Sequence, residues 1–207
     1  MKIRSLKARQ FAIMICSASL LAATTPLRAG DGSSGGLYLN SDVGVNLMDN
    51  LTSPSTPAIS FNPGLRWDVS TGYGFKLVDK LVLAPELETG ILYNSLDKAA
   101  NGVPISGSYV QVPLLANLVL NCHVSDQFVV YAGAGGGFDL SAISISGPYA
   151  SAIGSETDAA WQVMAGIRYK FGGSSALGLG YKYLAFTPEG GNSVGNNSIF
   201  ASYTLNW

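Results

Sequence analysis

Apolar and polar residues alternate one by one in eight separate stretches after residue 36. In the last stretch, Ile199, Ala201 and Tyr203 alternate with Ser202 and Thr204. A period of two is typical of β-strands whose two faces meet different surroundings, and no stretch keeps the 3.6-residue spacing of an amphipathic helix for long. The chain is therefore predicted to be all-β, with strands at 37–47, 64–75, 81–93, 108–121, 127–141, 159–171, 176–186 and 198–207.

Short and long connections take turns between these predicted strands. The short connections lie at 76–80, 122–126 and 172–175, and the long ones at 48–63, 94–107, 142–158 and 187–197. Outer-membrane barrels have this asymmetry, with tight turns on the periplasmic side and longer loops outside. Strands of roughly 9–11 residues cross a bilayer when they tilt. We therefore predict an eight-stranded antiparallel up-and-down transmembrane β-barrel over residues 33–207, with four extracellular loops.

The charged residues of the predicted strands share one face. The other face carries no charge, as a lipid-facing surface requires, because a Lys or Arg at the bilayer midplane costs about 2–4 kcal/mol. We assign the charged face to the lumen, where small residues such as Gly166, Gly178 and Gly180 suit a narrow eight-stranded interior. The predicted lumen charge network consists of Asp42, Arg66, Asp68, Glu86, Glu88, Asp139, Arg168, Lys170 and Lys182.

Charges inside such a lumen must pair or accept hydrogen bonds, because an isolated buried charge is very costly. Arg66 and Glu88 lie at nearly matched distances from the predicted 76–80 turn, so we expect them to pair. Two interpretations of the network stay open. It is either a plug that fixes the barrel and blocks flow, or a charged gate lining a narrow pore.

Two local features complicate the pattern. The strand at 127–141 is rich in glycine and its phase is ambiguous; we place Val130 and Phe138 outward and Asp139 inward. Pro85 and Pro113 fall in the middle of predicted strands, where proline removes a ladder donor and is normally confined to edges or bulges. We expect bulges at both prolines.

The distribution of charged residues also predicts a targeting segment at the start of the sequence. Only 12% of the residues are charged, and five of the twelve basic residues lie before Gly30, where no acidic residue occurs. They flank the apolar segment 11–23, which at thirteen residues is shorter than the ~20 that a membrane-spanning helix needs. We predict that residues 1–29 are a cleaved signal peptide. The remaining chain has seven basic and thirteen acidic residues, which argues against a nucleic-acid partner.

The sequence offers little for catalysis. The chain without residues 1–29 keeps a single cysteine, Cys122, beside the only histidine, His123, in a predicted turn. No cluster of cysteine and histidine predicts a metal site, and no cofactor motif is present. Glu86 and Glu88 share a face and could suggest a glycosidase pair, but nothing marks a sugar cleft and pairing within the lumen explains them better. We therefore expect a protein that is not an enzyme.

Three segments resemble those of a known class of protein. Residues 198–207 resemble the terminal signature of bacterial outer-membrane barrels, with a final aromatic residue and apolar residues at alternate positions before it. Residues 109–115 are similar to a strand common in small porin-like barrels. Residues 180–184 resemble the penultimate strand of the OmpA, OmpX and opacity-type eight-stranded barrels. The resemblance extends over 33–207 and is more specific for the fold than for an activity.

This resemblance implies a location and partners. It implies residence in the bacterial outer membrane, contact with its lipid, and recognition of Tyr203, Leu205 and Trp207 by the outer-membrane barrel assembly machinery. Small barrels that modify lipid A use a histidine near the outer rim, and none is predicted there. We expect a non-enzymatic integral protein with a structural or surface-contact role and an extracellular ligand bound by the loops. The alternative is a narrow porin-like channel for ions or small solutes.

Overall fold

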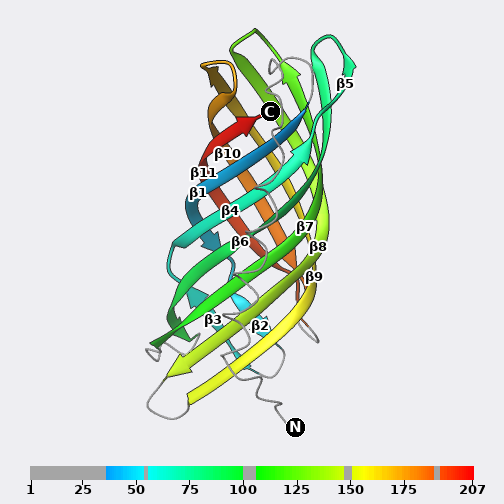
Figure 1. Cartoon of the computed structure of the whole chain (residues 1–207). Helices are drawn as coiled ribbons and strands as arrows, with labels where there is room; N and C mark the ends of the chain where they lie inside the picture. The colour runs from blue at the N-terminus through cyan, green and yellow to red at the C-terminus, as the bar shows by residue number, and fades with distance from the viewer. Residues whose placement is uncertain (1–35, 54–55, 100–105, 147–150, 189–191) are drawn as a thin grey trace.

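The computed structural model describes residues 36–53, 56–99, 106–146, 151–188 and 192–207 as a single tilted cylinder of β-strands (Figure 1). Within the described residues the strands are β1 (Leu37–Met48), β2 (Leu51–Ser53), β3 (Thr56–Phe61), β4 (Gly64–Tyr73), β5 (Phe75–Val78), β6 (Leu81–Ala99), β7 (Ser106–His123), β8 (Phe128–Ser146), β9 (Ser151–Phe171), β10 (Ser175–Phe186) and β11 (Val194–Asn206). The predicted signal peptide, residues 1–29, lies outside the described residues.

The sheet closes on itself. β1 pairs with β11 along its whole length, from Tyr38 opposite Asn206 to Met48 opposite Asn196. The closed ring consists of β1, β4, β6, β7, β8, β9, β10 and β11, and all its pairings are antiparallel. Where all eight strands of the ring pair with both neighbours, closure leaves no unpaired sheet edge among the described residues, which a structure in lipid requires. The prediction of an eight-stranded antiparallel barrel is confirmed.

The two ends of the cylinder differ. At one end, which we call the turn end, short turns join β5 to β6, β7 to β8 and β9 to β10. Gly172 and Gly173 in the last of these turns have φ of 63° and 75°, a left-handed conformation that favours glycine. The opposite end, which we call the loop end, receives the longer connections, and β2 and β3 form a small hairpin there that pairs with β6 (Figure 1).

Several segments predicted as loops are strands. The predicted loop 142–158 is largely the continuation of β8 and β9, whose ladder runs from Ile143 opposite Gly154 to Ser146 opposite Ser151. Parts of 94–107 and 48–63 are likewise paired. The loop prediction was wrong here because serine and glycine do not prevent pairing once a neighbouring strand supplies the hydrogen-bond partners.

The expected bulges at the two prolines are also wrong. Pro113 lies opposite Asp139 in an unbroken β7–β8 register. Pro85 of β6 lies opposite the interruption between β4 and β5. Both β4 and β5 pair with β6, and the register is the same on the two sides of Pro85. Gly74 at this interruption donates its N–H to the Gly36 carbonyl at 2.8 Å. The missing proline donor is therefore accommodated by a break in the neighbouring strand.

The faces of the strands are those that the alternation predicts. Ile199 and Leu65 on the outer face are 68% and 66% exposed, whereas Arg66 on the inner face is 1% exposed. In the glycine-rich β8, Phe138 is exposed and Asp139 is buried, so the phase chosen for this strand is confirmed. Every ring strand thus turns its apolar side outward.

Candidate functional site

A cluster of buried charges fills the middle of the lumen; we call it the central network. Arg66 Nε lies 2.5 Å from Asp68 Oδ2, and Arg66 Nη2 lies 3.1 Å from Glu88 Oε1, so the expected Arg66–Glu88 pair forms. Lys182 Nζ lies 2.7 Å from Asp42 Oδ2, 3.0 Å from Asp68 Oδ2 and 2.9 Å from Glu88 Oε1. Four strands, β1, β4, β6 and β10, bring these five side chains together.

Two amides connect the central network to the opposite wall. Gln162 of β9 donates to Glu88 Oε2 at 2.9 Å and to Asn117 Oδ1 at 3.0 Å, and accepts from Arg66 Nη2 at 3.2 Å. Asn117 of β7 donates to Glu88 at 2.9 Å and to Glu86 at 3.2 Å. Neither amide was among the predicted lumen residues, although both lie on the predicted inner face.

The other predicted lumen charges lie apart from the central network. Glu86 accepts from the Tyr38 hydroxyl at 2.9 Å and from Asn117. Towards the turn end, Arg168 Nη1 donates to Asn121 Oδ1 at 2.9 Å, and Lys170 Nζ lies 3.2 Å from His123 Nδ1. The lumen charges therefore form tiers along the axis rather than one site.

An acidic pair lies towards the loop end. Asp139 accepts from Gln111 Nε2 at 2.8 Å and lies opposite Asp158 in the β8–β9 register. Asp139 and Gln111 are completely buried. The structure thus places Asp139, like Arg168 and Lys170, away from Arg66 and Lys182.

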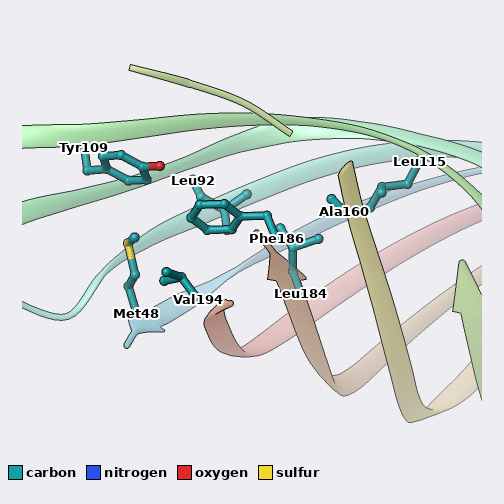
Figure 2. Close-up of a cluster of buried hydrophobic side chains, with 8 residues drawn as sticks. All are labelled: Met48, Leu92, Tyr109, Leu115, Ala160, Leu184, Phe186 and Val194. Carbon is teal, nitrogen blue, oxygen red and sulfur yellow. The ribbon is translucent and has the colours of Figure 1, made fainter. Parts of the chain in front are cut away.

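An apolar cluster fills the lumen at the loop end (Figure 2). Leu92, Leu184 and Phe186 have no exposed surface. The full cluster contains Met48, Leu92, Tyr109, Leu115, Ala160, Leu184, Phe186 and Val194, with Leu51, Phe61 and Ile143 packed against it. This layer was not predicted from the sequence, because the period of two assigns a residue to the inner face but does not tell which inward apolar side chains meet across the lumen.

The described residues offer little for metal binding or catalysis by a metal. No group of three or more His, Cys, Asp or Glu side chains among them is arranged to hold an ion. Across the same ranges, no helix has the length and apolar character needed to span a membrane.

The closed ring, its uncharged outer face and its ionised interior define an integral membrane barrel. The chain belongs to the outer membrane protein β-barrel domain family, whose model matches residues 12–206. It is therefore a bacterial outer-membrane protein, as expected from the resemblance. No curated protein matches the sequence.

Solved structures agree on the fold. Neisserial surface protein A (NspA) is 16% identical, with a TM-score of 0.55 over 84% of this chain and 99% of that one. OprG from Pseudomonas aeruginosa is 10% identical, with a TM-score of 0.50 over 84% of this chain and 98% of that one. At these identities the likeness concerns the fold alone.

Two residues of the predicted assembly signal, Tyr203 and Leu205, lie on the outer face of β11 near the turn end. Tyr203 is exposed and Leu205 is half-buried opposite Leu39 of β1. Trp207 follows the strand, and its N–H donates to the Leu37 carbonyl at 2.9 Å. Recognition of these residues by the assembly machinery stays a prediction.

Proposed function

We propose that this protein is a non-enzymatic, sealed outer-membrane barrel that presents a contact surface for an extracellular protein at its loop end. Residues 1–29 direct the chain across the inner membrane and are removed, and Tyr203, Leu205 and Trp207 direct insertion of the barrel. The loop end then faces outward and the turn end faces the periplasm.

Two consecutive layers support a sealed lumen. The apolar cluster at the loop end contains side chains with no exposed surface, and a dry layer of this kind opposes the passage of ions. Below it, Arg66 and Lys182 are held by three carboxylates. These are Asp42 of β1, Asp68 of β4 and Glu88 of β6. Mutual pairing supports the interpretation of the network as a plug over that of a charged gate, and makes the narrow channel the second candidate.

The observation that carries the contact role is an uncovered strand edge. Residues 151–159 of β9 pair with β8, but the pairing of β9 with β10 begins only at Ala160, opposite Phe186. No strand among the described residues covers the other side of 151–159. On the far side of the same wall, by contrast, β3 covers the end of β6, with Ile59 opposite Ala99.

An uncovered edge has unpaired backbone donors and acceptors that an extended peptide can satisfy as an added strand. Ser155, Glu156 and Thr157 on this segment are exposed. The proposed partner is therefore an extended segment of an extracellular protein, bound mainly through its backbone.

The test is binding of the purified barrel to an array of synthetic nine-residue peptides. Removing 140–157 and joining the shortened β8 and β9 by a two-residue turn should abolish peptide binding, because it removes seven of the nine residues of the uncovered edge. As a control, shortening the covered β6–β7 pair by removing 96–107 should preserve binding. Both variants should still migrate differently before and after boiling. Absence of binding by the unaltered barrel, or equal binding by the β8–β9 variant, would contradict the contact role.

A further inference from the structure

Charge is separated along the axis of the lumen. The acidic pair Asp139 and Asp158 lies towards the loop end, and the central network lies in the middle. Towards the turn end lie two basic residues, Arg168 and Lys170. A small anion is therefore attracted to the turn end of the lumen and repelled from the loop end.

A cavity of about 70 Å³ occupies the lumen at the turn end. This volume exceeds the ~10–15 Å³ that a single water molecule needs, so the cavity has room for a small polyatomic ion. Its polar lining consists of Tyr38, Asn121, His123, Arg168, Lys170, Thr204 and Asn206, and Trp207 also borders it. None of the described residues that line it is an aspartate or glutamate.

Arg168 is the central feature of this cavity. The residue is 9% exposed, and its guanidinium packs 4.0 Å from the centre of the Tyr131 ring while Nη1 donates to Asn121. Its buried Nε has no hydrogen-bond partner. In the described part of the chain, no carboxylate lies within ion-pair distance of this side chain. A buried cation with an unused donor is costly unless an anion accepts from it.

We propose that the turn-end cavity binds a small oxyanion, a phosphate or a carboxylate, through Arg168 Nε. Lys170 adds a second positive charge, and the Thr204 hydroxyl and the Asn206 amide lie in the same lining. The site opens towards the turn end and stops below the central network, so the anion enters from that side. It is independent of the contact surface at the loop end.

A phosphate at this position has two sources: a free ion, or the headgroup of a lipid in the adjacent leaflet. The two share the same chemistry at Arg168. Micelles of dodecyl maltoside contain no phosphate, whereas a phosphatidylglycerol bilayer supplies headgroups, so comparing the two environments distinguishes the sources.

The experiment is a titration of the folded barrel with inorganic phosphate in maltoside micelles, followed by the arginine side-chain Nε–H signals in an NMR spectrum. Without residues 1–29 the chain contains two arginines, Arg66 and Arg168. The Arg168 signal should shift and saturate. The Arg66 signal should stay in place, because Arg66 Nε is already bonded to Asp68. Chloride at the same ionic strength should give no saturation.

Substitutions of single residues test whether the cavity side chains bind the anion. Binding, followed by the backbone amides of 204–206, should weaken roughly tenfold or more in Arg168→Gln, because a charge-assisted hydrogen bond is lost. Lys76→Gln, which removes an exposed charge at the turn end but outside the cavity lining, should bind like the unaltered barrel. If Arg168→Gln does not fold, Arg168→Lys and Lys170→Gln should each still fold and bind more weakly.

The titration in a lipid bilayer distinguishes the two sources of phosphate. In a phosphatidylglycerol bilayer, an Arg168 signal already at its saturated position identifies the headgroup as the source, and a signal that still responds to added phosphate identifies the free ion. A response equal to that with chloride, or saturable binding that persists unchanged in the Arg168 and Lys170 variants, would overturn the proposal.

Discussion

At the scale of single residues, the lumen contains ionised side chains that no solvent stabilises. Lys182 contacts three carboxylates, and Arg66 contacts two. Each cation therefore compensates several acids at once. Removal of one partner from a buried set of charges is much more costly than loss of a surface pair, because the remaining charges keep the desolvation cost without its compensation.

We expect Lys182→Met to reduce the free energy of unfolding by about 3–5 kcal/mol, since it leaves Asp42, Asp68 and Glu88 with one cation among them. Urea-induced unfolding in lipid vesicles measures this change. Lys76→Met is the control, because the exposed pair of Lys76 with Asp79 contributes less than about 1 kcal/mol. Equal stabilities of the two variants would show that the central network does not hold the barrel.

At the scale of the elements, β10 shows how a narrow cylinder accommodates bulky inner side chains. Between Ala176 at the turn end and Leu184 at the loop end, its inner face carries Gly178, Gly180 and Lys182. The small residues leave space for Tyr131 of β8 and Phe200 of β11. A side chain at Gly180 would place its Cβ 2.5 Å from both Tyr131 Oη and Phe200 Cζ. The sequence suggested small inner residues, and the structure shows which side chains need them.

Gly180→Ala should therefore destabilise the barrel by about 1–3 kcal/mol through overpacking. Gly136→Ala provides a matched control in β8, because the nearest heavy atom to the added Cβ is the Ala160 carbonyl oxygen at 3.6 Å, an ordinary contact. Urea midpoints of the two variants in the same vesicles compare them. A smaller loss of stability for the Gly180 variant than for the Gly136 variant would contradict this packing.

At the scale of the whole molecule, closure and filling act together. The β1–β11 pairing completes the ring, and the central network with the apolar cluster occupies its interior. The ring hides the backbone from lipid, and the contents of the ring determine whether solutes pass. An eight-stranded barrel is narrow enough for side chains to fill.

The unaltered barrel should be electrically silent in a planar lipid bilayer, because both layers of the lumen are filled. Arg66→Ala should also stay silent, since the apolar cluster remains in place. Current steps from the unaltered protein that change in the Arg66 variant would instead favour the porin-like channel. Samples should first be shown to be folded by their different migration before and after boiling.

The alternation of residues, together with the succession of short and long connections, was sufficient to predict the ring of eight strands, its antiparallel order and the outward phase of residues such as Phe138. It could not predict how far β8 and β9 extend beyond the bilayer, because serine- and glycine-rich segments suit a loop and a paired strand equally. Nor could it separate Arg168 and Lys170 from Arg66, since alternation specifies a face but no height along the axis.

The sequence by itself determined which face of each strand is apolar and which carries the ionised residues, because in a strand the side-chain period of two assigns every residue to a face. Only the tertiary structure decided which side chains meet. Arg66 lies opposite Leu92 and Glu88 opposite Ser70, yet the guanidinium and the carboxylate pair inside the lumen. The physical reason is that contacts across a closed barrel depend on the stagger of all its strands and on the reach of long side chains, which no single strand encodes.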